Sequence, residues 1–249
     1  MSALDLDPTV AHDAATGGAA KRSYVRDVFS EIAPSYDLLN HLLSLNIDRR
    51  WRRRAIAALD CARRPDGLYV DLCAGTLDVG AELARTPAFR GFILGADFAE
   101  PMLRAGRDKA PVSALAPVVS DALQLPVRDG QASGIIVAFG ARNLADLDAG
   151  LREMHRVLEP GGRAVILEFT TPRSRVVRAL YHLYFHHVLP AVGGMVSGHG
   201  TAYRYLPESV AHFPAEPELA RRMERAGFRD VRWHSLSLGI AAIHRGTRS

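Results

Sequence analysis

The stretch from Gly67 to Ala84, GLYVDLCAGTLDVGAELA, constrains the fold of this chain more than any other. It starts with an apolar run that ends on Asp71, turns at Ala74-Gly75, and continues with apolar residues at helical spacing. A strand, a tight turn and a helix in this order form the first unit of a doubly wound α/β fold, whose ligands lie beyond the carboxyl ends of the strands. The sequence therefore predicts a ligand site at this turn.

The next apolar run, 92–96, ends on Asp97, which lies 22 positions after Gly75. An acidic residue about 20 positions on is where Rossmann-type sites hold ribose hydroxyls. A dinucleotide is not expected, because G-x-G-x-x-G would need glycines where the chain has Cys73 and Asp78, and the Asp78 carboxylate would repel a pyrophosphate. S-adenosylmethionine, with a cationic end and no phosphate, fits better. A strand–turn–helix unit that serves only the fold stays the alternative at this point.

The composition indicates one large α/β domain: 249 residues, 48% of them apolar and 23% charged, can enclose a sizeable core. Two cysteines without paired spacing, Cys61 and Cys73, indicate a reducing compartment and favour the cytoplasm. Segment 1–20 is rich in Ala, Asp and Gly and does not resemble a secretory signal, so we expect a disordered lead-in. No apolar run of about 18 residues occurs, so no membrane span is expected.

Helical patterns precede the first strand. Apolar residues at helical spacing over 25–32 stop at Pro34, and a second pattern follows over 38–43. We expect these helices to cover the site as a lid, with Tyr36 and Asn40 facing the ligand. Capping or packing at a helix junction is the alternative role for both residues.

Three clusters allow both a functional and a plainer interpretation. Arg49–Arg54, RRWRRR, could contact RNA or anionic lipid, or could be a solvated helix face around a buried Trp51. His182 and His186 share one helix face, but no carboxylate accompanies them, so no metal is expected. The apolar and aromatic segment 179–198 could receive a long apolar part of a substrate or simply pack on the core.

Strands and helices alternate along the rest of the chain, which predicts a Rossmann-like, doubly wound, seven-stranded and mostly parallel sheet. Three carboxylates, Asp71, Asp97 and Asp121, fall at strand ends along one edge, as expected for a polar ligand laid across the sheet. The expected strands are 68–71, 92–97, 117–119, 134–139, 163–169, 231–238 and 240–244, and the expected helices after the first unit are 101–109, 147–158 and 216–226.

A resemblance to a known family is carried by seven stretches: VFSEIAPSYDLLNHLLSLNIDRRWRR, DLCAGTLD, SDALQLPV, FGARNL, RVLEPGGRAVILEF, YRYLPESV and GIAAIHRG. From about Ser23 to the C-terminus the chain resembles the quinone-ring C-methyltransferases of menaquinone and ubiquinone biosynthesis. The methyl-donor motifs alone indicate the class I methyltransferase superfamily, whereas FGARN, YRYLPES and GIAAIHRG are more specific to this family.

The resemblance implies methyl transfer from S-adenosylmethionine to a ring carbon of demethylmenaquinol, giving menaquinol, with the ubiquinone-pathway benzoquinol as a second acceptor. It implies that Asp97 takes the ribose hydroxyls, that Asp121 and the Ala122 amide hold the adenine, and that Thr76 lies beside the methionine moiety. The donor-binding candidates are Asp71, Gly75, Thr76, Asp97, Asp121 and Ala122. The catalytic candidates, facing the quinol head group, are Arg142, Asn143 and Tyr36.

The chain departs from the family at Leu77, where many members have glycine. Leucine does not easily take a positive φ, so we expect a turn of a kind that tolerates a side chain there.

The implied substrate carries an isoprenoid tail, which costs roughly 0.8 kcal/mol per exposed CH₂ to remove from a bilayer. We therefore expect a cytoplasmic enzyme that is peripherally associated with the inner membrane surface, through 179–196 and Arg49–Arg54. A homodimer is allowed. The expected layout is a lead-in (1–20) and a single domain (21–249), made of a helical lid (21–60), a donor-binding core (67–169), a substrate-side insertion (173–213) and a closing helix and strands (214–249).

Rival interpretations stay open. One is a methyltransferase for RNA or for another apolar small molecule; RRWRRR favours RNA, whereas 179–198 favours an apolar acceptor, and no nucleic-acid partner is expected. Another is a non-catalytic scaffold of a quinone pathway, which Leu77 favours. An NAD-dependent oxidoreductase is disfavoured by the missing glycines and by Asp78.

Overall fold

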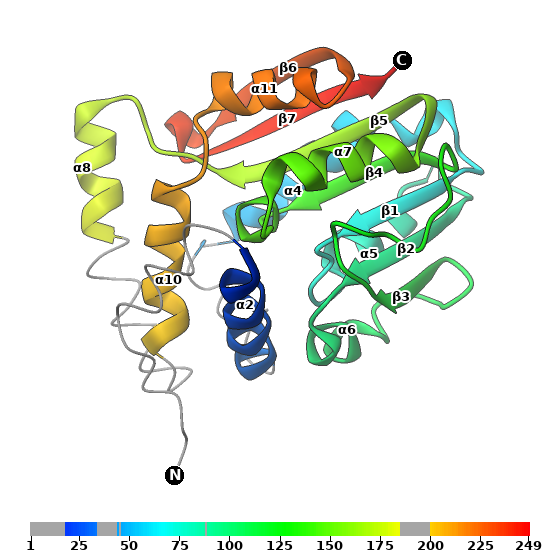
Figure 1. The fold of residues 1–249 in the computed structure, drawn as a ribbon, viewed down its shortest axis with the longest axis horizontal. Coiled ribbons are helices and arrows are strands. Elements are labelled where there is room, and N and C mark those ends of the chain that lie inside the picture. The colour runs from blue at the N-terminus through cyan, green and yellow to red at the C-terminus, as the bar shows by residue number, and fades with distance from the viewer. Residues whose placement is uncertain (1–17, 34–43, 45, 88, 185–199) are drawn as a thin grey trace.

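A seven-stranded sheet forms the centre of the protein, with helices on both of its faces (Figure 1). The computed structural model describes residues 18–33, 44, 46–87, 89–184 and 200–249. The strands are β1 (Leu68–Leu72), β2 (Phe92–Asp97), β3 (Leu115–Val119), β4 (Ala132–Ala138), β5 (Leu158–Phe169), β6 (Phe228–Leu236) and β7 (Ala241–Arg248). Their order is β3-β2-β1-β4-β5-β7-β6, with β1 to β5 parallel and β7 antiparallel to both neighbours. The predicted fold class is confirmed.

Two hydrophobic clusters, one on each face of the sheet, make up the core. Tyr69 and Val70, neighbours on β1, belong to different clusters because successive side chains of a strand point to opposite faces. Both faces are covered, which explains why β4 is an almost continuous apolar run, buried from Ala132 to Val137. Helices α4 (Ile47–Leu59) and α5 (Asp78–Ala84) pack in one cluster, and α7 (Leu147–Val157) and α11 (Glu216–Arg225) pack in the other.

Three helices lie beyond the carboxyl ends of the parallel strands (Figure 1). They are α2 (Gly18–Ile32), α8 (Arg175–Leu183) and α10 (Gly200–Ala211). Helix α2 contacts α10, α6 (Glu100–Gly106) and the short helix η2 (Ala141–Asn143), which directly follows β4. The short helices η1 (Cys61–Arg63) and η4 (Ser237–Gly239) complete the described elements, and η4 supplies the break predicted at Gly239.

Helix α2 begins at Gly18 and ends at Ile32, ahead of Pro34 as predicted. Residues 1–17 and the second expected lid helix, 38–43, lie outside the described residues, as do Tyr36 and Asn40.

Strand β5 differs from the expectation. It begins at Leu158, directly after α7, and not at Arg163. Leu158 pairs with Ala132 of β4, and the next pair is Arg163 with Gly134. The register shifts between these two pairs, so residues 159–162, which contain the turn signal, lie between them. Gly161 takes a φ of 79°, a left-handed value that suits glycine. The Pro-Gly-Gly signal therefore marks an irregularity inside the strand.

The basic cluster lies on α4. Four of its arginines, Arg49, Arg50, Arg53 and Arg54, are exposed, and Trp51 is buried, as expected for a solvated helix face. Arg52 is the exception: it is buried and pairs with Asp48 (3.3 Å) and Asp78 (2.5 Å). No helix within the described ranges has the length and apolarity that crossing a bilayer requires.

Candidate active site

The turn between β1 and α5 is the first part of the site. Cys73, Gly75 and Leu77 take left-handed φ values of 55°, 52° and 64°. The turn is held by hydrogen bonds from the Ala74 amide to the Ala96 carbonyl (3.1 Å) and from the Leu77 amide to the Ala74 carbonyl (2.8 Å). Its backbone is therefore fixed against the neighbouring strand β2.

The expectation for Leu77 is wrong, because this residue does take a positive φ. Its side chain is 1% exposed and lies over Gly95 of β2, where an added Cβ would come within 2.4 Å of it. A left-handed non-glycine residue costs about 1–2 kcal/mol, and burying a leucine side chain contributes about 1.5–3 kcal/mol. Burial thus offsets the strain, and Gly95 makes the space for it.

Asp97, at the end of β2, orders the turn. Its Oδ2 accepts a hydrogen bond from the Gly75 amide (2.8 Å), and its Oδ1 accepts one from the Ala99 amide (2.9 Å). Burial raises the pKa of Asp97 in spite of these amide donors. The Phe98 amide also donates to this carboxylate, and because each carboxylate oxygen has two lone pairs, Asp97 keeps acceptor capacity of the kind that a ribose hydroxyl requires.

Asp71 lies behind the turn, with a side chain only 1% exposed. Its Oδ2 accepts a hydrogen bond from the Gly80 amide (2.8 Å) in the first turn of α5. Burial raises the pKa of Asp71 to about 7, against the opposing effects of the Gly80 amide and Arg52. This carboxyl group anchors α5 against β1, so its contribution to the site is the position of the turn.

Thr76 and Asp121 are further donor-binding candidates. Thr76 is buried, and Gly106 of α6 approaches it so closely that an added Cβ would collide with its carbonyl oxygen. Asp121, two residues past β3, accepts a hydrogen bond from the Leu123 amide (3.0 Å) and pairs with Arg22 of α2 (2.9 Å). Ala122, the other adenine candidate, is partly buried beside it.

Arg142, on η2 after β4, forms the second part of the site. It donates from Nη1 to Oε1 of Glu168 (2.7 Å) and to the Phe139 carbonyl, and from Nε to Oγ of Ser209 (3.3 Å). Its guanidinium also lies 5.6 Å from the ring centroid of Phe169. Arg142 and Glu168 are both buried, at 9% and 1% exposure. This is a fixed ion pair inside the protein, not a surface contact.

Asn143 accepts a hydrogen bond from α10, and α2 packs behind the residue that donates it. The hydroxyl of Tyr205, on α10, donates to its Oδ1 (3.2 Å), and the Tyr205 ring packs on Tyr24 of α2 at 5.4 Å between centroids. Burial raises the pKa of Tyr205, so the hydroxyl stays a donor at neutral pH. Two helices remote in sequence therefore meet over η2.

The two parts adjoin. β1 and β4 are neighbouring strands, and an added Cβ at Gly140 would come within 2.3 Å of the Cβ of Cys73 in the donor turn. The structure thus brings together the predicted residues of the donor turn with Arg142 and Asn143. Tyr36 lies outside the described residues. Within those residues, no group of three or more His, Cys, Asp or Glu side chains could hold a metal ion.

Several partners of the predicted residues were not expected from sequence. Glu168 lies next to the carboxyl end of β5, as Asp71 and Asp97 lie at or near the carboxyl ends of β1 and β2, so its position was a usable signal. Tyr205 and Ser209 lie in the YRYLPES stretch, whose pattern alone does not reveal which side chains turn toward η2. Arg22 and Lys21 carry no signal beyond their positive charge.

Solved structures with the same fold include methyltransferases. A possible histamine N-methyltransferase from Thermotoga maritima is 18% identical, with a TM-score of 0.62 over 90% of this chain and 99% of its own. A putative methyltransferase from Haloferax volcanii, solved with the Trm112 activator, is 16% identical, with a TM-score of 0.64 over 88% and 96%. The fold is therefore that of the class I methyltransferases.

The model of the ubiE/COQ5 methyltransferase family matches residues 18–248. A ubiquinone/menaquinone biosynthesis C-methyltransferase of Geobacter sulfurreducens is 46% identical over 92% of this chain and 90% of its own length. A demethylmenaquinone methyltransferase of Thermus thermophilus is 48% identical over 89% of this chain and 100% of its own. The chain belongs to the ubiE/COQ5 methyltransferase family, and it is an S-adenosylmethionine-dependent C-methyltransferase of quinone biosynthesis.

Proposed function

We propose that this enzyme transfers the methyl group of S-adenosylmethionine to a ring carbon of demethylmenaquinol, giving menaquinol. The observation that carries the choice of acceptor is the 48% identity to the full length of the Thermus demethylmenaquinone methyltransferase. The ubiquinone-pathway benzoquinol is a second acceptor, because the Geobacter relative is named for both quinones.

On the donor side, Asp97 accepts the two ribose hydroxyls, and Asp121 with the Ala122 amide holds the adenine. Gly75 and Thr76 line the methionine end. Support comes from the remaining acceptor capacity of the Asp97 oxygens and from the fixed backbone of the turn. Because Asp121 already pairs with Arg22, adenine and α2 meet at the same carboxylate.

On the acceptor side, Arg142 and Asn143 orient the oxygens of the quinol ring. Nε and Nη1 of Arg142 are engaged, whereas its Nη2 donates no hydrogen bond to the described residues. That nitrogen is the donor for the substrate. The ring carbon must lie about 3 Å from the methyl group, in line with the departing sulfur, and a fixed guanidinium secures this alignment.

A transfer assay tests the acceptor. Labelled S-adenosylmethionine is supplied with reduced demethylmenaquinone and, separately, with the reduced benzoquinone intermediate, each in liposomes. Label in the naphthoquinol is the expected result, and label in both would make the enzyme serve two pathways. Donor binding without label in either quinol would contradict the proposed acceptors.

We also propose that α8 and η4 rest on the bilayer that holds the prenyl tail. Val176, Leu180 and Leu183 lie on one face of α8, spaced by four and three residues, and are 70%, 63% and 56% exposed. Leu238 of η4 is 79% exposed, and the adjacent Gly239 packs near Pro172, just ahead of α8. Apolar side chains with a basic surround bind anionic lipid surfaces.

The charges around this surface fit that partner. Helix α8 contains no acidic residue, and Arg173 and Arg175 at its start are exposed. The surface also lies at the carboxyl edge of the sheet, which carries the catalytic candidates (Figure 1). The exposed arginines of α4, Arg49, Arg50, Arg53 and Arg54, are a second basic contact for the same membrane.

Co-sedimentation with vesicles tests this contact. Leu180→Glu should reduce binding to vesicles that contain anionic phospholipid several-fold, and Val112→Glu, at a 73% exposed apolar residue outside α8 and η4, should not. Equal binding by all three proteins would contradict the proposal. A variant that instead changes the oligomeric state, measured by light scattering, would assign the same face to a homodimer.

A further inference from the structure

Lys21, in the first turns of α2, is a buried lysine that the proposed mechanism leaves without a role. Its side chain is 8% exposed. It shares one helix face with Tyr24, Val25 and Val28, which follow at intervals of three, four and seven residues and are also buried. Helix α2 contacts α10 and η2, so Lys21 belongs to the end of the molecule that carries Arg142.

Arg142 acts on Lys21 electrostatically. Burial lowers the pKa of Lys21, and the positive charge of Arg142 lowers it further. Both effects favour the neutral amine, which is the form that can accept a proton. Lysine side chains whose pKa is lowered by burial serve as bases in some enzymes.

Arg142 and Lys21 differ in whether a neighbouring negative charge balances their positive charge. Arg142 has a full negative charge beside it, the Glu168 carboxylate at 2.7 Å. Among the described residues, the Lys21 amine has no hydrogen bond or ion pair. When Lys21 is protonated, this end of the site therefore has one positive charge that Glu168 does not offset, and a phenolate would supply its counterpart.

We propose that Lys21 is a further catalytic residue, which takes the hydroxyl proton of the quinol and then stabilises the phenolate as an ammonium ion. This role rests on the proposed function, since it requires a quinol acceptor. The geometry behind it is the burial of Lys21 on a helix that contacts η2, together with the engagement of Arg142 by Glu168.

The quinol O–H bond breaks and an N–H bond forms on Lys21, which leaves a phenolate. The ring carbon then forms a bond to the methyl group with an electron pair from the phenolate ring, and the S–CH₃ pair stays on sulfur. The same ring carbon loses its hydrogen to water as a proton, and the oxygen recovers its proton from the Lys21 ammonium. The net reaction releases one proton.

Other titratable or charged groups share this end of the molecule with Lys21. They come from each element packed around η2: Arg142 on η2, Glu168 on β5, Tyr181 on α8, Tyr205 on α10, and Arg22 and Tyr24 on α2 itself. Burial raises the pKa of Tyr181 and of Tyr205, so both stay protonated at neutral pH and neither competes as the base.

Substitutions at Lys21 test the role. Lys21→Met keeps the length and burial of the side chain, whereas Lys21→Arg keeps the charge but cannot accept a proton. Both should lower kcat on demethylmenaquinol about 100-fold or more at neutral pH, with the donor Kd unchanged. Arg26→Met, at an exposed cation on the same helix, is the control and should match wild type.

The pH profile separates a base from a structural residue. Wild-type kcat should fall as Lys21 becomes protonated at lower pH, whereas both variants should recover activity at high pH, where the quinol ionises by itself. A Lys21→Arg enzyme with near wild-type kcat, or a Lys21→Met profile parallel to wild type, would overturn the role. Wild type that labels neither quinol would instead overturn the proposed function.

A binding measurement with a nitronaphthol is independent of turnover. Its phenolate absorbs visible light, so the spectrum reports whether the bound phenol is ionised. Wild type should bind it as the phenolate well below the pKa of the free phenol, and Lys21→Met should bind it as the neutral phenol. The same spectrum with both proteins would contradict the assignment.

Discussion

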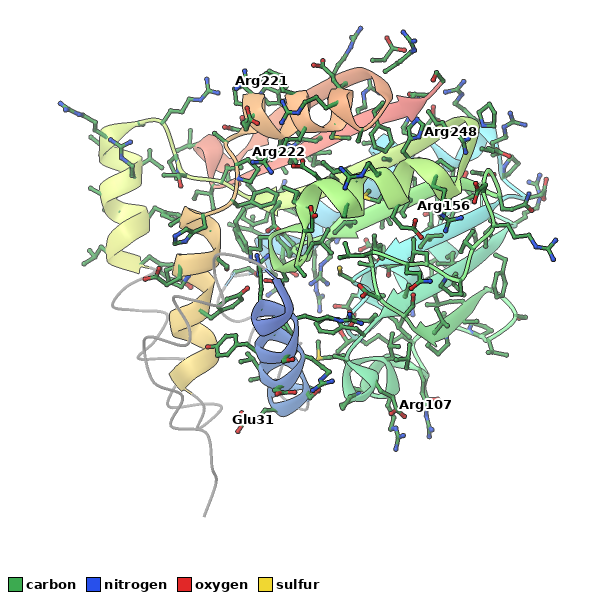
Figure 2. The ribbon with its side chains drawn as sticks, viewed as in Figure 1. Glu31, Arg107, Arg156, Arg221, Arg222 and Arg248 are labelled. Atoms are coloured by element: carbon green, nitrogen blue, oxygen red, sulfur yellow. The ribbon has the colours of Figure 1, made fainter. Side chains whose placement is uncertain are left out.

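Two arginine ion-pair groups lie near the two ends of α7, and therefore at opposite ends of the parallel strands. Arg142, just before α7, is at the carboxyl ends of the strands and pairs with Glu168; their side chains are 7% and 1% exposed. Arg156, in the last turn of α7, lies at the other edge (Figure 2) and pairs with Glu153 (2.7 Å) and Asp129 (2.5 Å). Arg156 is 33% exposed and Asp129 is 76% exposed.

This difference in exposure distinguishes an ion-pair group that contributes a little to stability from one that serves function. The hydrogen bonds that Arg156 donates to Glu153 and Asp129 raise the pKa of Arg156, but solvent and salt screen such a half-exposed group, and its contribution to stability is small. A buried pair such as Arg142–Glu168 loses several kcal/mol of hydration per ion, on the order of what the attraction returns. Because the Arg142–Glu168 pair adds little net stability and lies next to the turn between β1 and α5, we infer that its role is to hold Arg142 in position.

The largest expected effect is at Arg142. Removing the guanidinium alone would leave Glu168 buried without a partner, so the comparison is between Glu168→Gln and Glu168→Gln with Arg142→Ala. The double variant should lose about 10²–10³ in kcat, as for the removal of an oxyanion donor, with the donor Kd nearly unchanged. Single-turnover rates and calorimetry measure the two quantities. Equal losses in both would show that Arg142 belongs to donor binding.

The second prediction concerns Asp71 and pH. Because burial raises its folded pKa to about 7 from 3.8, the folded state binds more protons than the unfolded state between these values. The stabilisation is complete below the unfolded pKa and is lost as pH rises through the folded pKa. From pH 5 to 8, wild type should lose about 3 kcal/mol of unfolding free energy from this group.

Asp71→Asn keeps the acceptor for the Gly80 amide and removes the titration. Urea unfolding at pH 5 and pH 8 should therefore show a smaller fall in stability for the variant than for wild type. The same fall in both proteins would assign a normal pKa to Asp71.

The donor turn also illustrates what sequence reasoning can reach. Asp97 and the turn at Gly75 were predicted, because a strand–turn–helix unit and an acidic residue at the next strand end are local patterns. The left-handed conformation of Leu77 was not predicted, because the space above Gly95 that accommodates its side chain comes from a strand that pairs through a long-range contact. Glu168 and Tyr205 were missed as partners of the site for the same reason.

Asp97→Asn should weaken donor binding, since the amide can accept at one oxygen only and its NH₂ faces a backbone donor. The lost charge-assisted hydrogen bonds correspond to about 1.5–3 kcal/mol, or roughly 10- to 150-fold in Kd. Calorimetric titration with S-adenosylmethionine measures it. An unchanged Kd would remove Asp97 from the ribose site and leave it as a support of the turn.

The smallest effect is expected at the other edge. Arg156→Met keeps the packing of the side chain but removes the pairs with Glu153 and Asp129, and it should cost about 1 kcal/mol or less of stability. Wild type and variant should converge as salt is raised, because the exposed Asp129 contact is screened. The kcat should not change, since Arg156 is at the edge of the sheet away from α2 and α8 (Figure 2). A loss of kcat comparable to that of Arg142→Ala would break the distinction between the two edges, because it would mean that α7 transmits the Arg156 contacts to η2.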